Sequence, residues 1–537
     1  MSNHLLETDL LTYFDCNACV GQYGYKHHRQ VWRTEDVVSE MERCGIAGAI
    51  VHHGLSRTHA PDYGNRRLAA ELGKSPRLFG CWAVLPDHAT DFASPAELME
   101  ALREHDIRAV TMFPRTHQFE LDNRTVGALL TELERAQIPL FIQSDEISFA
   151  QLDGILDRHP HLSVLLLGCY WGQERRLFPL MDAYPRLGID LSGLQSNRII
   201  ETLYQRYGAE RIFYGSGMPY KSPGAARAMI DYADIPYRAK QLIAGENLSK
   251  LLGIKPPTAV FQADAITFQA AKGIAIDAVN VLDSHTHLIE DGGRTGSGLP
   301  MLGGDIDAMM AMYRRLGIRS MSIAPWAGIN GGDAAAGNMI AEQARSRFPQ
   351  EVNCYAVIDP NYTRDVAAEA RKWHLEKQFT GMKPYYYLSH TAYTDPVYKP
   401  WWELANERHL YALVDPALIA DQQYVEWIDE LATCYPQVQI FMDHAGRSFE
   451  IADLYAEVAL RHDNVTLQLT YTSVPLGVIE YLTEQVGARK ILFGTDSPMR
   501  DPRPQLGWLA YANLSLEDKR QLFGDNFRRI LQRCKLK

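Results

Sequence analysis

The sequence predicts an α/β protein made of two tandem (β/α)8 TIM barrels. Three observations lead to this prediction. The chain has 537 residues, more than one hydrophobic core usually holds. Short apolar runs alternate with amphipathic helical stretches along its length. The two halves also repeat one another at nearly constant spacing, which is typical of a duplicated domain.

The internal repeat is visible in four pairs of matching positions. The pairs are Asp15 and Asp283, Gly64 and Gly337, Gly208 and Gly487, and Asn247 and Asn526. Their spacings are 268, 273, 279 and 279 residues. Because the offset drifts so little, we expect the halves to share one fold with small loop insertions.

Each half contains eight candidate strands. In the first half they are the runs at 12–18, 47–53, 80–86, 108–114, 139–145, 163–169, 187–193 and 211–217. In the second they are the runs at 279–285, 318–325, 352–359, 379–386, 410–416, 438–446, 465–471 and 490–496. Eight strands separated by helices in about 260 residues match a closed barrel, whereas an open doubly wound sheet needs fewer strands.

The boundary between the halves is expected near "GIKPPTAVFQADA", where Pro256-Pro257 ends the preceding helix. We therefore predict a first barrel over 1–254, a linker over 255–275 and a second barrel over 276–537.

Composition narrows the class of protein. The formal charge of −11 argues against nucleic acid and anionic membranes as partners, yet it is compatible with a small anionic substrate in a locally basic pocket. No apolar stretch approaches the ~20 residues of a membrane helix, and the acidic start does not resemble a signal peptide. Eight scattered cysteines do not indicate a disulfide scaffold. A cytoplasmic location is expected.

The candidate site lies in the second half, at the carboxyl ends of its strands, where barrel enzymes place their catalytic groups. His285 and His287 are two residues apart on the first strand, so they project to the same side and can share a metal ion. Four more titratable residues end later strands: Lys383, Asp415, His444 and Asp496. A divalent ion among them would polarise a carbonyl group and lower the pKa of water towards ~7.

Each of these residues also has an ordinary interpretation. His444 alone would be a structural histidine, Asp496 could cap the next helix, and Lys383 could be a solvated rim lysine. Their joint placement at strand ends, in the order that a metal barrel requires, favours a functional site.

The motifs "DSHTHL", "DHAG" and "FGTDSP" of the second half resemble the amidohydrolase superfamily. Within it, the similarity is to the group that includes aminocarboxymuconate semialdehyde decarboxylase and the pyrone dicarboxylate lactonases. The resemblance implies barrels of the metal-dependent hydrolase type, in which His285, His287 and Asp496 are metal ligands. It also implies that His444 is a ligand or a catalytic acid or base.

The sequence departs from this group at the fifth strand, where Asp415 stands in place of the usual histidine. With Asp415 as a fourth ligand, the expected cofactor is one divalent ion, with zinc as first choice and manganese or iron as alternatives. A weak or absent metal is the other interpretation. Lys383 occupies the strand on which binuclear relatives carry a carboxylated lysine. We expect a mononuclear site, with Lys383 contacting substrate as a cation.

The first half lacks this set of groups. Its counterparts of His285, His287, Lys383, Asp415, His444 and Asp496 are Asn17, Cys19, Thr111, Gln143, Gly168 (to within one residue) and Gly217. A non-catalytic barrel is the preferred interpretation. The alternative is a separate small-molecule site lined by His52, His53, Arg115 and His117.

The predicted activity is hydrolysis of a small carboxylated cyclic amide, lactone or related compound. Asp496 would serve as general base, and His444 would polarise the carbonyl or protonate the leaving group. The candidate substrate contacts are Arg294, Trp326, Tyr385, Arg447 and Arg500. Alternatives are non-oxidative decarboxylation, a metal-independent lactonase and a non-enzymatic two-barrel binding protein. Whether the chain forms a homo-oligomer is left open.

Overall fold

The computed structural model describes residues 10–536 except 25, 26, 295, 297, 416–421 and 473. The chain divides into two compact units. The first comprises residues up to Gln195 together with Ile199–Ala263, and the second comprises Ser196–Arg198 and the chain from Asp264 onward. No helix in the described part of the chain is long and apolar enough to cross a membrane.

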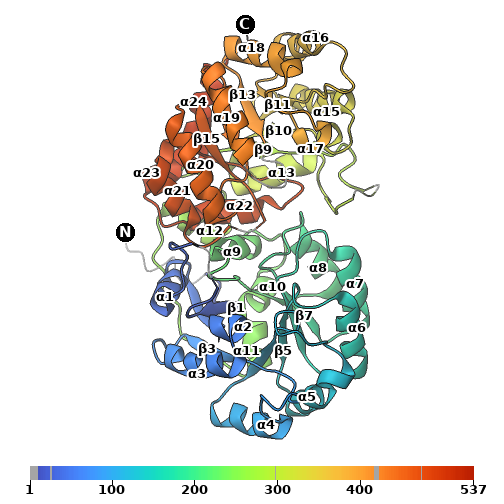
Figure 1. Ribbon diagram of the computed structural model, residues 1–537, viewed down its shortest axis with the longest axis vertical. Helices are drawn as coiled ribbons and strands as arrows, with labels where there is room; N and C mark the ends of the chain where they lie inside the picture. The colour runs from blue at the N-terminus through green and yellow to red at the C-terminus, as the bar shows by residue number, and fades with distance from the viewer. Residues whose placement is uncertain are drawn as a thin grey trace. The chain divides into compact units, whose positions relative to one another are not determined.

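The first unit is an eight-stranded parallel barrel whose strands pair in chain order (Figure 1). Between β8 and β1 a parallel bridge joins Met218 to Ala18, which closes the sheet. Its strands are β1 (Tyr13–Val20), β2 (Ile46–His53), β3 (Leu78–Ala83), β4 (Ala109–Met112), β5 (Leu140–Gln143), β6 (Val164–Leu167), β7 (Leu187–Asp190) and β8 (Ile212–Phe213).

Helices between these strands form the outer layer of the first barrel (Figure 1). Local sequence explains where several begin: Ser94 and Ser148 each close a capping box with the residue three positions later, Glu97 and Gln151. The helices are α1 (Thr34–Arg43), α2 (Gly54–Thr58), α3 (Pro61–Leu72), α4 (Pro95–Glu104), α5 (Asn123–Ala136), α6 (Phe149–Arg158), α7 (Glu174–Ala183), α8 (Ile199–Tyr207), α9 (Pro223–Asp231), α10 (Tyr237–Gln241) and α11 (Asn247–Leu252).

The second unit repeats this architecture, with β9 to β16 again pairing in chain order. A bridge between Thr286 and Ser497 joins the last strand to the first. The strands are β9 (Val281–Thr286), β10 (Ile318–Ile323), β11 (Val352–Ala356), β12 (Gly381–Met382), β13 (Tyr411–Val414), β14 (Gln439–Met442), β15 (Val465–Leu469) and β16 (Ile491–Phe493). Two tandem (β/α)8 barrels, the predicted fold class, are therefore confirmed.

The helices of the second unit occupy the corresponding positions between strands (Figure 1). They are α13 (Ile306–Leu316), α14 (Trp326–Ile329), α15 (Ala334–Arg347), α16 (Val366–Arg371), α17 (Tyr386–Ser389), α18 (Lys399–Arg408), α19 (Gln422–Cys434), α20 (Phe449–Arg461), α21 (Val478–Val486), α22 (Pro502–Ala510), α23 (Leu516–Arg520) and α24 (Asn526–Arg533).

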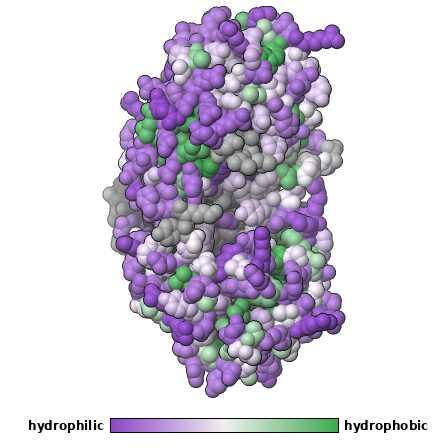
Figure 2. Space-filling model, viewed as in Figure 1, coloured by the Kyte–Doolittle hydropathy of each residue, from purple (hydrophilic) through white to green (hydrophobic). Residues whose placement is uncertain are grey.

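Each barrel has its own interior core of strand side chains. Phe14, Phe141 and Leu165 pack at the centre of the first, and Tyr355, Tyr411 and Phe441 at the centre of the second. Because the interior is filled, ligands can reach only the ends of the strands. The outer surface in view is mostly hydrophilic, with scattered hydrophobic residues (Figure 2).

The segment predicted as a linker contains a helix, α12 (Ala265–Ala271). Asp264 caps it by accepting a hydrogen bond from the Thr267 amide at 2.7 Å, and it also pairs with Lys519 at 2.6 Å. The Thr267 hydroxyl donates to the Ala510 carbonyl at 2.7 Å. The polar contacts of α12 therefore attach the end of the predicted linker to the second barrel.

Candidate functional site

Two histidines at the end of β9 begin the site. His285 and His287 are 2% and 3% exposed, and alternation along the strand turns both side chains to the same side. Asp283 lies two residues earlier and stabilises the end of the strand. Its carboxylate accepts hydrogen bonds from the Tyr313 hydroxyl at 2.6 Å and from the Thr495 amide at 3.1 Å.

Each histidine is held through Nδ1, which leaves Nε2 facing the same carboxylate. His287 Nδ1 donates to the Ala324 carbonyl at 2.9 Å, and His285 Nδ1 lies 3.2 Å from Asp443 Oδ1. The Nε2 atoms lie 2.7 Å and 3.7 Å from Asp496 Oδ1, for His287 and His285 respectively. Hydrogen bonds through Nδ1 to a carbonyl or a carboxylate are typical of histidines that bind metal through Nε2.

Both imidazoles are neutral at neutral pH. Burial lowers the pKa of His285 to about 3 and that of His287 to about 4, although the Asp443 carboxylate opposes the shift at His285. Because the Ala324 carbonyl can only accept, His287 carries its proton on Nδ1. Its bare Nε2 therefore faces a carboxylate oxygen at 2.7 Å, and a bound cation would satisfy both atoms.

Asp496 follows β16 and has the left-handed backbone φ of +59°, which is strained for a residue with a side chain. Its second oxygen, Oδ2, forms an ion pair with Arg500 Nη1. Arg500 is also buried, and its Nε donates to the Thr472 hydroxyl at 2.6 Å. Burial lowers the pKa of Arg500 to about 10, so it remains a cation at neutral pH.

A second group of possible ligands joins Asp415, Asp443 and His444. His444 Nε2 lies 3.6 Å from Asp415 Oδ2, and its Nδ1 lies 3.1 Å from the Thr470 carbonyl. His444 has φ of +60°, so it too follows its strand in the left-handed region. The structure thus places Asp415 beside His444, whereas among the described residues the candidate ligands grouped with Asp496 are the two β9 histidines.

Asp443 is a central residue that the sequence analysis missed. It is fully buried; its Oδ1 contacts His285, and its Oδ2 lies 3.5 Å from the Lys383 ammonium. Burial alone would raise the pKa of this carboxyl, but the hydrogen bond from His285 and the charge of the Lys383 ammonium hold it well below its usual range. The signal in the sequence is an acid within the apolar run "QIFMDHAG", directly before His444.

Lys383 follows β12 and is 1% exposed, so it is a buried lysine and the rim interpretation is wrong. Its ammonium also lies 5.4 Å from the centre of the Tyr385 ring. Trp326 stacks edge-on against His287, with ring centres 5.3 Å apart. These two aromatic rings therefore border the cluster from the β10 and β12 ends.

Tyr471, two residues after β15, lies near two of the three arginines that were predicted to contact substrate. The guanidinium carbons of Arg447 and Arg500 lie 6.0 Å and 5.4 Å from its ring centre, and the His444 ring lies 5.6 Å away. Arg294 is different: its side chain is 80% exposed and lies 3.9 Å from Asp305. The described contacts do not connect Arg294 with the cluster.

The first barrel fills the matching space with a hydrogen-bonded network of two amide side chains and one carboxyl group. The Gln143 amide donates to Asn17 Oδ1 at 2.8 Å, and Asn17 Nδ2 donates to Asp190 Oδ2 at 2.8 Å. Gly168 and His444 each follow the sixth strand of their barrel with a left-handed φ, of +68° and +60° respectively. This matches Gly168 to His444 and Leu167 to Asp443, which resolves the alignment that the sequence left open by one residue.

The four residues of the alternative first-barrel site have different surroundings. His53 caps α2 by accepting from the Leu55 amide at 3.1 Å, and His117 Nε2 lies 3.0 Å from the Arg57 carbonyl. Arg115 lies at the surface near the Asp145 carbonyl. His52 alone lines a small cavity at the strand ends, together with Asn17, Thr111 and Gln143.

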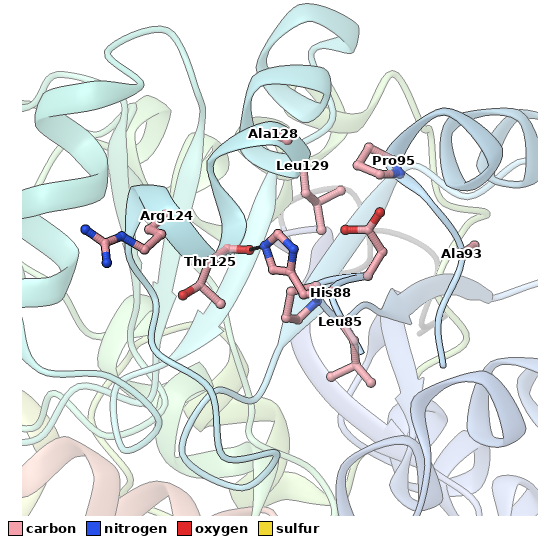
Figure 3. A pocket seen from close by; sticks show the side chains of 10 residues that line it. Leu85, His88, Ala93, Pro95, Arg124, Thr125, Ala128 and Leu129 are labelled. Atoms are coloured by element: carbon pink, nitrogen blue, oxygen red, sulfur yellow. Dashed lines mark hydrogen bonds between the residues drawn. The ribbon is translucent and has the colours of Figure 1, made fainter. Parts of the chain in front are cut away.

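The first barrel also has a surface crevice between the loop after β3 and helix α5. Figure 3 shows His88 pointing at the Thr125 carbonyl, 3.1 Å from Nε2, with Leu85, Pro95 and Leu129 around it. None of the predicted site residues lines this crevice, and we assign no function to it.

Comparisons with solved structures find enzymes of low sequence identity, each of which matches about half of this chain. 5-Carboxyvanillate decarboxylase from Novosphingobium aromaticivorans is 12% identical with a TM-score of 0.39, over 48% of this chain and 98% of its own. A 2,6-dihydroxybenzoate decarboxylase from Rhizobium is 15% identical with a TM-score of 0.38, over 47% and 99%. 4-Oxalomesaconate hydratase from Rhodopseudomonas palustris is 14% identical with a TM-score of 0.36, over 47% and 96%.

A comparison with curated proteins finds no match. The model of the family described as Amidohydrolase matches the chain twice, over residues 28–254 and 282–533. These two segments span most of both barrels, including the β9 histidine His285 and the strand-end Asp496. The chain therefore belongs to the amidohydrolase family, with one copy of the family domain in each barrel.

Proposed function

We propose that the second barrel is catalytic, that it holds one divalent metal ion between His285, His287 and Asp496, and that it hydrolyses a small carboxylated cyclic amide or lactone. The observation that carries the proposal is the 2.7 Å approach of His287 Nε2 to Asp496 Oδ1. Two hydrogen-bond acceptors face one another there, and His285 Nε2 faces the same oxygen, buried and with no hydrogen-bond partner in the described part of the chain.

These residues fit a metal in their chemistry. Two neutral imidazoles and one carboxylate suit zinc, manganese or iron, with zinc as first choice. A bound ion would polarise the substrate carbonyl and make water more acidic. The chain's own contribution is to present the three donors from strand ends that are fixed by Asp283, Ala324 and Asp443.

Asp496 and His444 carry out the two proton transfers of hydrolysis. Water attacks the carbonyl carbon while Asp496 accepts its proton, and the ring C–O or C–N bond then breaks. The leaving oxygen or nitrogen takes a proton from His444 Nε2. Asp415, 3.6 Å from that nitrogen, orients the imidazole and stabilises its protonated form.

Buried cations suit a substrate with at least one carboxylate. Lys383 and Arg500 are 1% and 5% exposed, so water screens their charges poorly. Arg500 and Arg447 both lie near Tyr471, which brings two guanidinium groups and one aromatic ring together. Such an arrangement binds carboxylates and the ring that carries them.

Non-oxidative decarboxylation of a similar substrate is the second candidate. The ion pair between Asp496 and Arg500 favours it, because a carboxylate paired with a guanidinium is a weaker base towards water. In that reaction the carbon–carboxylate bond breaks, and the His444 proton is transferred to the carbon that loses CO2.

The test uses the full chain with a panel of carboxylated lactones, cyclic amides and ¹³C-carboxyl aromatic acids. Hydrolysis incorporates ¹⁸O from labelled water into the product acid and releases no CO2, whereas decarboxylation releases ¹³CO2. Metal content is measured in parallel on the wild type and on His285→Asn. A protein that binds no zinc, manganese or iron, or that turns over no member of the panel, contradicts the proposal.

His374→Gln is the matched control for the metal measurement. Burial lowers the pKa of His374 to about 4, so it resembles the β9 histidines in environment. However, both of its nitrogens already have hydrogen-bond partners. Nδ1 donates to the Phe379 carbonyl at 2.7 Å, and Nε2 accepts from the Trp401 indole at 2.8 Å. The control should keep the metal that His285→Asn loses.

A further inference from the structure

Thr470 lies between the two groups of candidate ligands in the second barrel. It directly follows β15 and is 1% exposed. Its hydroxyl oxygen lies 2.7 Å from His444 Nδ1, 3.0 Å from Asp443 Oδ1 and 3.0 Å from Gln468 Oε1. Because a hydroxyl group has a single proton to donate, these three contacts restrict one another.

The surroundings of His444 Nδ1 favour a proton on that nitrogen. Besides the Thr470 hydroxyl, Nδ1 faces the Thr470 carbonyl at 3.1 Å and Asp443 Oδ1 at 3.5 Å. A carbonyl oxygen and an ionised carboxylate oxygen can only accept hydrogen bonds. A bare Nδ1 would place its lone pair against both of these oxygens, whereas a protonated Nδ1 donates to Thr470 and is attracted by Asp443. The neutral His444 ring therefore carries its proton on Nδ1.

The Thr470 hydroxyl completes this arrangement by accepting from Nδ1 and donating to Asp443. A hydrogen bond to a carboxylate is stronger than one to an amide oxygen, so Asp443 takes the hydroxyl proton in preference to Gln468. Asp443 Oδ1 also accepts from the His444 amide at 2.9 Å and lies 3.2 Å from His285 Nδ1. One carboxylate oxygen thus connects His285 of the proposed metal site with Thr470 and His444.

A proton fixed on Nδ1 leaves Nε2 of His444 as the nitrogen that gains and loses a proton in catalysis. Nε2 lies 3.6 Å from Asp415 Oδ2. In both reactions considered above, His444 gives a proton to the substrate, and this transfer then uses Nε2. Without the Thr470 hydroxyl, the proton on Nδ1 would keep only the more distant carbonyl as its hydrogen-bond acceptor. The balance between the two ring tautomers would then shift towards Nε2.

We propose that Thr470 is a positioning residue for His444, whose hydroxyl holds the imidazole proton on Nδ1 and keeps Nε2 for proton transfer. Thr470 acts through His444 and Asp443, and we assign it no contact with substrate. The role of His444 as an acid or base rests on the proposed function, whereas the position of its ring proton does not.

The test is NMR of the full chain labelled with ¹⁵N-histidine, because long-range ¹H–¹⁵N spectra distinguish a protonated ring nitrogen from a bare one. His444→Gln identifies the His444 signals by their loss, and the pH is raised until this ring is neutral. We expect a protonated Nδ1 and a bare Nε2 in the wild type. Thr470→Val keeps the shape of the side chain but removes the hydroxyl, and should raise the share of the other tautomer about fivefold.

Two variants control for the substitution itself. Thr470→Ser retains the hydroxyl and should keep the wild-type tautomer. Thr466→Val makes the same change within β15, where the hydroxyl donates to the Ile440 carbonyl at 3.3 Å, and should leave the His444 signals unchanged. Thermal unfolding of each variant checks the fold. Thr470→Ala, which also lacks the hydroxyl, replaces a valine variant that does not fold.

The position of the ring proton decides the proposal. A proton on Nε2 in the neutral wild-type ring overturns it, and so does a tautomer ratio in Thr470→Val equal to that of the wild type. For a member of the substrate panel that the chain turns over, Thr470→Val should lower kcat about tenfold with KM unchanged, and Thr470→Ser should restore it. A chain that turns over no member contradicts the proposed function, while the tautomer still decides the role of Thr470.

Discussion

Asp496 and Gly217 occupy the same turn of their respective barrels, with backbone φ of +59° and +74°. Both follow the last strand of a barrel, and both precede a dipeptide ending in proline. The left-handed conformation suits glycine and costs a residue with a Cβ about 1 kcal/mol or more. The second barrel therefore places its central carboxylate in a strained turn, and the first barrel has the unstrained version of that turn.

Replacing Asp496 by glycine or by alanine should separate strain from function. Both variants should lose the proposed metal and the proposed activity, because both lack the carboxylate. Both also leave Arg500 without its ion pair, so that cost cancels in the comparison. We expect Asp496→Gly to be more stable than Asp496→Ala by about 1 kcal/mol, measured by denaturant unfolding.

The reciprocal change provides the control for this strain. Gly217→Ala introduces a Cβ at φ of +74° and 2.9 Å from the Lys221 chain, and should destabilise by about 1–2 kcal/mol. Equal stability of the glycine and alanine variants at position 496 would show that the turn stores no strain.

Lys383 and Asp443 should be energetically coupled. Each is buried, and their charged atoms are 3.5 Å apart. Lys383→Met alone leaves the buried Asp443 carboxylate without the neighbouring ammonium, and should lower the free energy of unfolding by about 3 kcal/mol. Asp443→Leu alone leaves the buried Lys383 ammonium without its carboxylate partner. The leucine copies Leu167, which occupies this position in the first barrel.

The double variant should cost less than the sum of the single ones, with a coupling free energy of about 1–3 kcal/mol in a denaturant double-mutant cycle. Lys377→Met, at a partly exposed ion pair with Glu342, is the matched control and should change stability by less than about 1 kcal/mol. Additive effects at 383 and 443 would show that the pair does not interact.

The buried β9 histidines should make the metal-free protein sensitive to acid. Their folded pKa values of about 3 and 4 lie below the unfolded value near 6.5. Between about pH 6.5 and 4, the unfolded chain takes up protons at these sites and the folded chain does not. The free energy of unfolding should therefore fall as pH falls, by about 1.4 kcal/mol per pH unit for each histidine.

The measurement compares chelator-treated wild type with the double variant His285→Asn, His287→Asn by denaturant unfolding at several pH values. Groups with the opposite sign, such as Asp283, whose pKa burial raises to about 6, are present in both proteins and cancel. The wild type should lose stability more steeply than the variant. Parallel pH dependences would indicate that these imidazoles are protonated in the folded state.

Asn17 should matter for the stability of the first barrel. Its amide joins Gln143 to Asp190, and Asp190 is fully buried. Asn17→Leu removes both bonds and leaves polar atoms unsatisfied, so we expect a loss of about 2–3 kcal/mol. Thr131→Ala, on α5, is the control and should cost less than about 1 kcal/mol by the same denaturant unfolding. If Asn17→Leu left the free energy of unfolding unchanged, water would already satisfy these polar groups.

The sequence by itself determined the architecture and most of the candidate site. Alternation of apolar strands with helices, together with a spacing of 268 to 279 residues, is a property of local periodicity and duplication. The rule that strand ends carry the chemistry then selected His285, His287, Lys383, His444 and Asp496 without coordinates.

The tertiary structure decided how these groups are paired. Asp415 lies beside His444, Asp443 supports His285 and Lys383, and Arg500 neutralises one oxygen of Asp496. Such pairings depend on the orientation of side chains from strands far apart in the chain. Differences of one or two ångströms separate a ligand from a neighbour, and strand order and residue spacing do not specify the rotamers and loop turns that set those distances.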